Sequence, residues 1–372
     1  MALASMLLVY SAASMLAYNH QGGNTFFYFF KHTFFLATGM VIMYIIHKIN
    51  YRYFSRISQI LMWLSVPLLV LTIIMGEEVN SATRWLTIPV INQSFQTSDL
   101  AKLATIGFVA RLLSQKKDQL KSFKGAFLPV MLPVVMICAL ILPSDLSTAA
   151  VVFVSCVMLM FMAGLNWKYL FSLIPMGIFT FGIIFGIAKL KPEIFPRAET
   201  WISRVESFTS NEPDKDRDYQ PVMAKIAIAT GEIVGKGPGN SSQRAFLPQS
   251  SSDFIYAIVI EEYGLIGGLF VLLMYLILLY RSIKIVQKCE RSFAAFLVLG
   301  LSFSLVLQAL INMSVAVNLL PVTGQPLPLV SLGGTSVWFT CISLGIILSV
   351  SRSLDQQEMQ PEEEKGGNHV IA

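Results

Sequence analysis

Apolar runs close to the length that spans a membrane recur along this chain of 372 residues, and they constrain its fold more than any other feature. Only 13% of the residues are charged, too few to cover the surface of a soluble protein. A helix satisfies its backbone hydrogen bonds within the segment itself, so each run is predicted to cross the membrane as a helix. The sequence therefore predicts an all-α polytopic membrane protein with about ten transmembrane helices, at residues 2–18, 26–46, 57–75, 98–113, 126–142, 148–165, 169–188, 254–280, 293–311 and 331–350.

The lysine and arginine residues of the short loops predict how these helices are oriented. One set of alternate loops carries twelve basic residues, whereas the opposite set carries only Arg84. Basic loops stay in the cytoplasm, so the first set is cytoplasmic and both termini lie inside. These loops also explain the net charge of +5, which is therefore no sign of nucleic-acid binding. We expect a short basic segment to precede Met1, because the first run lacks one.

Residues 1–352 are predicted to form a single transmembrane domain, and residues 353–372 a disordered cytoplasmic tail that is acidic and then glycine-rich. Three of the four cysteines lie in predicted spans and one in an inner loop, so no disulfide framework is expected. The four histidines are scattered and lack the spacing of metal ligands.

The predicted outer side carries one large loop, residues 189–252, between spans seven and eight. Loops of this length are usually functional or disordered. It begins with an amphipathic stretch at 192–208 that can lie along the membrane interface. A glycine-rich stretch at 231–240 lacks the strand and the Lys-Ser/Thr ending of a phosphate loop. Its glycines either let the backbone pass close to other helices or a ligand, or form a flexible linker.

A second outer segment, residues 312–330, contains three prolines and no charged residue. Because ordinary outer loops are polar, this composition predicts a re-entrant or buried segment that lines a cavity. The small residues that follow at 331–336 permit close helix packing. They also fit a helix start that presents backbone N–H groups to an anion.

Asp253 stands at the start of an apolar run, directly after three serines. A carboxylate at the membrane–water boundary can be ionised yet only partly hydrated, which suits a general base acting on a lipid-borne substrate. An aspartate in this position is also a good helix N-cap. The two roles are compatible, because a cap also fixes a side chain.

Other polar residues lie in the outer halves of the predicted spans or beside them. Asp99 and Lys102 are three residues apart, so they share a helix face and are expected to pair. Any one of these residues alone fits a cap, a snorkelling anchor or a structural ion pair. Their common position predicts a polar cavity open to the outer leaflet, and the other members are Arg84, Asp145, Glu261 and Glu262.

Five segments carry motifs in a recognisable order: 8–14 (LVYSAAS); 84–85 (RW) with 95–104 (FQTSDLAKLA); 143–148 (PSDLST); Gln243 and 247–255 (LPQSSSDFI) with 261–264 (EEYG); and 320–328 (LPVTGQPLP) with 331–336 (SLGGTS). Together they resemble the SEDS family (shape, elongation, division and sporulation), the FtsW/RodA-type peptidoglycan glycosyltransferases. The resemblance covers essentially the whole chain and favours an FtsW-like division protein over a RodA-like one.

Some positions depart from the family pattern. Thr97 and Asp99 replace proline and glutamate, Ser144 is inserted before Asp145, and Ser147 replaces glycine. Residues 249–252 replace the family's EAHT directly before the key aspartate. The charge types survive, so we expect the site to survive. The missing glutamate and histidine bear on acceptor recognition and pH dependence.

The resemblance implies polymerisation of lipid II, a disaccharide-pentapeptide on undecaprenyl diphosphate, at the outer face of the bacterial cytoplasmic membrane. The 4-hydroxyl of the acceptor GlcNAc attacks the anomeric carbon of the donor MurNAc with inversion, and the motif places Asp253 as the base. The residues implied to bind substrate are Lys102, Asp99, Arg84, Asp145, Gln243, Arg244, Pro326, Pro328, Ser331, Gly333 and Gly334.

The diphosphate leaving group needs positive charge or hydrogen-bond donors. Candidates are Lys102, Arg84, Lys236, Arg244, and the backbone N–H groups of Gly333 and Gly334. The resemblance also implies assistance by Mg²⁺ or Mn²⁺, although the sequence identifies no dedicated metal site. It further implies a class B penicillin-binding protein and other divisome membrane proteins as partners.

Three rival functions remain open on the sequence. A transporter or flippase of a lipid-linked sugar fits ten spans and a polar cavity equally well, although no internal repeat is evident. An elongation-type polymerase would share the chemistry. A scaffolding division protein would use the polar loops as docking surfaces and leave Asp253 without a chemical role.

Overall fold

The computed structural model describes most of the chain, namely residues 1–13, 16, 18, 24–79, 82–88, 93–173, 175, 177, 182, 186, 198–209, 219–247 and 250–367. Most of the predicted seventh span and parts of the long outer loop lie outside these residues, so the predictions there stand untested.

Six helices among the described residues are long and apolar enough to cross a membrane, and each coincides with a predicted span. A helix of about 20 residues is about 30 Å long, the thickness of the hydrocarbon layer. The six are α3 (Thr25–Lys48), α4 (Arg52–Met75), α6 (Leu128–Ile141) with the π-helical turn Phe123–Phe127 before it, α11 (Ile255–Lys288), α12 (Ser292–Ala316) and α13 (Gly334–Gly367).

Large apolar side chains stay exposed on the outward faces of these helices. Phe30 on α3, Trp63 on α4 and Leu265 on α11 are 66%, 57% and 51% exposed. Soluble proteins rarely leave so much contiguous apolar surface in water. A lipid environment removes that cost, so the exposure supports a membrane protein.

Three further helices coincide with predicted spans that are shorter or more polar. α1 (Ala2–Ala12) and α7 (Leu146–Met162) are apolar but have only 11 and 17 residues. α5 (Thr97–Gln115) carries Asp99, Lys102 and Arg111 within its length. These helices are consistent with the predicted topology, and the count of ten spans stays a prediction.

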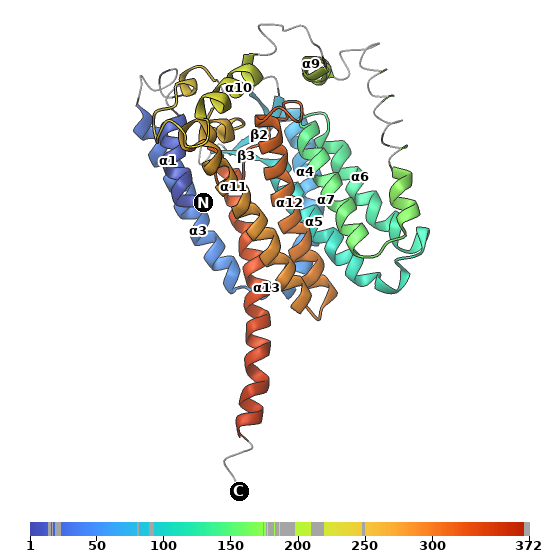
Figure 1. Cartoon of the computed structure of the whole chain (residues 1–372). Coiled ribbons are helices and arrows are strands. Elements are labelled where there is room, and N and C mark those ends of the chain that lie inside the picture. The colour runs from blue at the N-terminus through green and yellow to red at the C-terminus, as the bar shows by residue number, and fades with distance from the viewer. Residues whose placement is uncertain are drawn as a thin grey trace.

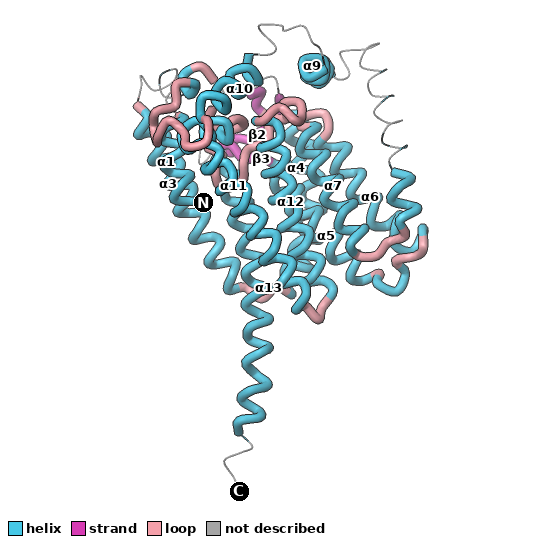
Figure 2. Tube along the Cα trace, viewed as in Figure 1, coloured by secondary structure: helices cyan, strands magenta, loops and turns pink. Residues whose placement is uncertain are grey.

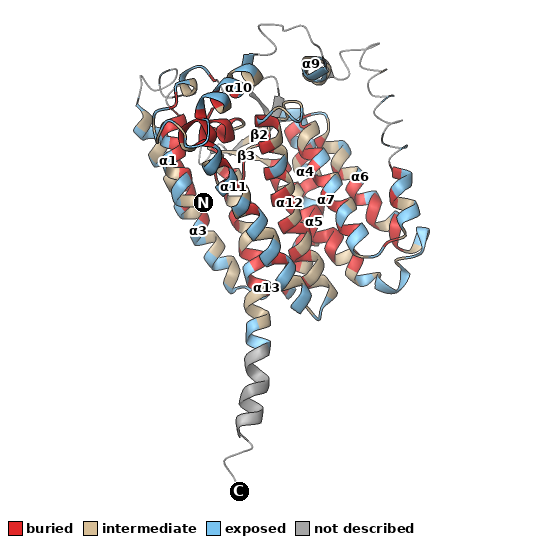
Figure 3. Cartoon of the chain, viewed as in Figure 1, coloured by how far each residue is buried: buried red, intermediate tan, exposed pale blue. Residues whose placement is uncertain are grey.

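The helices form one bundle (Figure 1), and its described residues make two large hydrophobic cores and a small third cluster between α3 and α13. α5 lies within the first core, where it packs against α4, α6, α7 and α12, and most of its residues are buried (Figure 3). The second core joins α1, α10 (Tyr219–Gly231), α11 and α12. α12 takes part in both cores and therefore couples them.

Loops gather at the end of the bundle that carries α10 and the strands (Figure 2), and we call this the predicted outer end. The helix α9 (Ala198–Thr209) and a short 3₁₀ turn (Gln243–Ala245) also belong to it. At the opposite end α13 extends beyond the other helices and stays helical to Gly367. We had expected a disordered tail from residue 353, but its Gln- and Glu-rich sequence also favours a helix.

A small antiparallel sheet corrects the prediction of an all-α fold. Its strands β1 (Glu77–Val79), β2 (Ala82–Ile88) and β3 (Gln93–Gln96) pair in the order β1-β2-β3. Aromatic and β-branched residues around Trp85 favour extended backbone. β3 leads directly into α5 and lies against the start of α13, because the rings of Phe95 and Phe339 are 5.5 Å apart. The sheet therefore fixes the outer end of α5.

Candidate active site

Asp253 lies in the turn that precedes α11, at the predicted outer end, and is partly exposed. α11 begins at Ile255 with Phe254 in the N-cap position, one residue after Asp253, and a capping role for the Asp253 side chain stays a prediction. Ser250 and Ser251 in this turn are buried. The Ser250 hydroxyl donates to the carbonyl of Ala12 (2.9 Å). Asp253 therefore belongs to a hydrogen-bonded turn and not to the helix itself.

Three consecutive carbonyls of this turn each accept a hydrogen bond from α12 or from the non-helical residues 331–332 that precede α13. The carbonyl of Ser251 accepts from the N–H of Leu332 (2.8 Å), and that of Ser252 from the hydroxyl of Ser331 (2.6 Å). The carbonyl of Asp253 accepts from Nδ2 of Asn312 (2.8 Å). These bonds fix the backbone that bears the candidate base.

The segment 321–331 is neither helix nor strand, and its residues are buried or half-buried. The prediction of a buried segment at 312–330 therefore holds for residues 321–330 only, because residues 312–316 belong to α12 and Val317, Leu319 and Leu320 are exposed. The carbonyls of segment 321–331 are satisfied by side chains of neighbouring helices, as buried polar groups must be. On α12, Gln308 donates to Pro326 (3.0 Å) and Asn312 donates to Gln325 (2.7 Å). On α11, the Tyr275 hydroxyl donates to Pro328. Pro326 and Pro328, two of the predicted site residues, thus take part through backbone carbonyls that accept hydrogen bonds from α12 and α11.

The predicted pair of Asp99 and Lys102 is confirmed, with 3.2 Å between Oδ1 and Nζ. Nζ of Lys102 also donates to Oε1 of Gln308 (2.8 Å), so the pair is connected to the buried segment. Asp99 is only 5% exposed, and it lines a cavity of about 10 Å³ between α5, α12 and α13. That volume holds about one water molecule.

Asp145 caps α7 and is tied to the same segment. Its carboxylate accepts from the N–H of Thr148 (3.0 Å) and from the Thr148 hydroxyl (2.9 Å), a typical N-cap arrangement. The Thr148 hydroxyl in turn accepts from Nε2 of Gln325 (2.9 Å). Ser147, which replaces the family glycine, donates to the carbonyl of Thr323 (2.7 Å).

Several of the predicted site residues therefore fall into one connected network around residues 321–331. They belong to this segment or reach it through one or two neighbouring side chains, and they include Asp253, Ser331, Asp99, Lys102 and Asp145. Sequence reasoning missed the residues that make the connections. Gln308 and Asn312 were detectable in principle, because two amides four residues apart in an apolar span share one face.

The other predicted residues are placed differently. Nη1 of Arg244 donates to the hydroxyl of Ser11 (3.0 Å), and that hydroxyl donates to the buried carboxylate of Glu262. Nζ of Lys236 pairs with Glu261 (2.7 Å). Lys236 therefore pairs directly with a carboxylate, and Arg244 is connected to one through Ser11. Both cations are thus less available to bind a diphosphate.

Three of the predicted residues occupy the ends of elements. Gly334 begins α13, with Gly333 directly before it. Gln243 opens the 3₁₀ turn, and its N–H points to the Glu261 carboxylate. Arg84 belongs to β2, and its side chain lies outside the described part of the structure.

Among the described residues, no three His, Cys, Asp or Glu side chains come together as metal ligands would. Assistance by Mg²⁺ or Mn²⁺ stays a prediction, because Mg²⁺ is often held by one or two carboxylates together with substrate phosphates.

Membrane-length helices packed around a buried polar network define a multi-pass membrane protein with a site at one end of the bundle. A family model described as cell cycle protein, that of FtsW, RodA and SpoVE, matches residues 1–356. The chain belongs to this family, known as SEDS, and the resemblance found in its sequence is confirmed.

Relatives and a solved structure agree over nearly the whole chain. The probable peptidoglycan glycosyltransferase FtsW of Coxiella burnetii is 30% identical over 358 residues, covering 94% of this chain and 93% of that protein. Stage V sporulation protein E of Bacillus subtilis is 31% identical over 352 residues, covering 93% of each. A chain from "Structural coordination of polymerization and crosslinking by a peptidoglycan synthase complex" superposes with a TM-score of 0.71 at 24% identity, over 94% of this chain and 96% of that one. The last comparison bears on the fold alone.

Proposed function

We propose that this protein is a peptidoglycan glycosyltransferase that polymerises lipid II at the outer face of the cytoplasmic membrane, with Asp253 as the general base. The observation that carries this proposal is the turn 251–253, whose three carbonyls are each bound from α12 or the 331–332 segment. Three bonds on three successive residues hold the aspartate backbone in one position. The names of the FtsW relatives support the same activity.

The proposed chemistry places its demand on the nucleophile. The diphosphate-lipid is a good leaving group, so the acceptor sugar hydroxyl needs a base more than the donor needs an acid. Asp253 accepts the hydroxyl proton as the oxygen attacks the donor anomeric carbon and the bond to the diphosphate breaks. The α-linked donor becomes a β-1,4 linkage, so the reaction inverts.

An apolar cavity supports a lipid-borne substrate. It has a volume of about 280 Å³ and lies between α11 and α13, directly below the segment that holds the Asp253 turn. Pro328 and Leu329 form its upper wall, and Tyr275, Leu278 and Leu344 lie around it. A hydrocarbon chain entering here would have its head group near the polar network.

Partners and ions extend the proposal. A class B penicillin-binding protein would cross-link the strands that this chain makes, and other divisome membrane proteins would bring both to the division site. A divalent cation would enter with the diphosphate of the substrate. The relatives named FtsW favour a role in division over one in elongation.

Reconstitution with labelled lipid II and the cross-linking partner tests the proposal. Asp253→Asn keeps the shape of the side chain and removes the base, so polymerisation should fall by about 100-fold or more. Asp118→Asn, an exposed aspartate near the opposite end of α5, is the matched control and should retain native activity. Equal polymerisation by the Asp253→Asn protein would refute the base. Lipid transfer across the bilayer without polymerisation would instead identify a flippase.

A further inference from the structure

The helix α11 is interrupted at Gly264, about three turns after Asp253. Gly264 adopts φ 67° and ψ −172°, so residues 255–263 form a short upper segment that is separate from the long lower segment. Asp253 stands at the start of this upper segment. The direction of the candidate base therefore depends on whatever holds residues 255–263.

The glycine-rich stretch of the outer loop enters this interruption. The N–H groups of Lys236 and Gly237 donate to the carbonyls of Glu261 (3.0 Å) and Glu262 (2.9 Å). On the other side of Gly264, the N–H of Leu265 donates to the carbonyl of Glu232 (3.0 Å). The inserted segment, residues 232–237, thus makes hydrogen bonds in place of the helical ones that the break removes.

Close approach of the two backbones explains the glycines. A Cβ on Gly235 would lie 2.4 Å from the carbonyl oxygen of Glu262, and one on Gly264 would lie 2.1 Å from that of Ile233. Gly235 also has φ +86°, a conformation that L side chains rarely adopt. Of the two interpretations of this stretch, close backbone contact is confirmed and the flexible linker is wrong.

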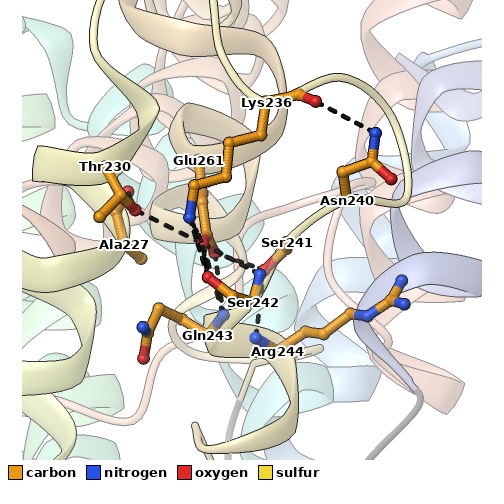
Figure 4. Close-up of polar contacts among 9 residues, drawn as sticks. All are labelled: Ala227, Thr230, Lys236, Asn240, Ser241, Ser242, Gln243, Arg244 and Glu261. Carbon is orange, nitrogen blue, oxygen red and sulfur yellow. Dashed lines mark hydrogen bonds and ion pairs between the residues drawn. The ribbon is translucent and has the colours of Figure 1, made fainter.

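The Glu261 side chain ties this insertion to the lead-in of the catalytic turn (Figure 4). Glu261 is fully buried, and its carboxylate accepts from Nζ of Lys236 (2.7 Å) and from the hydroxyl of Ser241. It also accepts from the N–H of Ser242 (3.1 Å) and of Gln243 (3.3 Å). The Glu261 carboxylate therefore links Lys236 to residues 241–243 through hydrogen bonds.

Two backbone hydrogen bonds connect Gln243 to Ser250, which lies in the turn that bears Asp253. The N–H of Leu247 donates to the carbonyl of Gln243 (3.0 Å), and the N–H of Ser250 donates to that of Leu247 (3.1 Å). These bonds connect the residues that Glu261 holds to Ser250, three residues before Asp253. Glu261 has its acceptor positions taken up by the protein and no exposed surface, so it does not contact substrate.

We propose that Glu261 is a positioning residue for Asp253. Lys236 and the inserted glycine-rich segment hold Glu261 in place. The proposal rests on Asp253 being the base of the proposed glycosyltransferase. It assigns a role in turnover to the loop 231–243. Loss of the carboxylate frees residues 241–243, so the turn that bears Asp253 loses its fixed direction.

Steady-state polymerisation of lipid II by the full-length protein with its cross-linking partner tests this role. Glu261→Gln should lower kcat by about tenfold to a hundredfold with little change in KM, because misplaced reacting groups cost rate rather than affinity. Lys236→Met, at a half-exposed side chain, should change kcat in the same direction by less. Glu290→Gln, an exposed glutamate in the loop between α11 and α12, is the control and should behave as the native protein.

Two further measurements separate positioning from general damage. The thermal midpoint of the Glu261→Gln protein should stay close to native, while hydrogen exchange of the amides in 241–250 should accelerate locally. An unchanged kcat overturns the proposal, as does a KM that rises as much as kcat falls, or a collapse of the thermal midpoint. If Asp253→Asn itself polymerises at the native rate, the proposed base fails, and that result is distinguishable from failure of Glu261.

Discussion

Asn312 joins the two parts of the candidate site, and its replacement gives the sharpest test of how the site is built. Its Nδ2 donates to the carbonyl of Asp253 (2.8 Å) and to that of Gln325 (2.7 Å), and the residue is only 1% exposed. Asn312→Ala removes both donors, so the carbonyls of Asp253 and Gln325 lose these two hydrogen bonds.

The expected magnitude follows from these two bonds. Side-chain hydrogen bonds within membrane proteins contribute about 0.6 to 1.7 kcal/mol each, so the pair contributes about 1 to 3 kcal/mol to the free energy of unfolding. The rate should fall further than stability predicts, because displacement of a base by about 1 Å can cost about 100-fold. We expect kcat to fall by about tenfold to a hundredfold and KM to change little.

The assay combines lipid II polymerisation with thermal unfolding in detergent. Asn24→Ala, at an exposed asparagine before α3 that makes no capping hydrogen bond, is the matched control and should be native in both measurements. If Asn312→Ala retains native kcat while Asp253→Asn does not, the clamp on the turn has no part in catalysis. The reasoning from the hydrogen-bonded turn would then be refuted.

Two other substitutions test the network and the insertion. Lys102→Met leaves the Asp99 carboxylate buried without its partner, which should destabilise the protein by about 3 kcal/mol or more in thermal unfolding; adding Asp99→Asn should restore part of this, and a further loss in the double variant would contradict the pairing. Gly235→Ala should expose residues 231–247 to proteases, because its Cβ would meet the Glu262 carbonyl. Gly239→Ala has a similar positive φ but no neighbour within 4 Å, so it should stay resistant, and equal sensitivity of both would argue against steric exclusion.

Features that depend on local composition were predictable from the sequence. The six long helices coincide with predicted spans because hydropathy over about 20 residues is set by the segment alone. The Asp99–Lys102 pair followed from a spacing of three residues on one helix. The non-helical, buried or half-buried residues 321–330 lie within the segment 312–330, for which prolines and a lack of charge predicted burial.

Features that depend on distant segments were not predictable. The sheet before α5 forms between three short strands, none of which carries a strong strand signal alone. The interruption of α11 at Gly264 is stable only because residues 232–237 enter it, and nothing near Gly264 in the sequence shows that partner. The connecting role of Asn312 likewise arises from a turn 59 residues earlier in the chain.

The buried segment 321–331 also determines when this site can come into being. Its bonding partners include the Ser5 hydroxyl, which donates to the carbonyl of Val330 across 325 residues of sequence, and Ser147, which lies 176 residues before its partner Thr323. Contacts of such long range close last, because the entropy of the intervening chain opposes them. A chain whose synthesis has not yet reached residues 321–331 therefore lacks the segment that connects the parts of the candidate site. The site is completed only late in synthesis, after most of the membrane helices have been made.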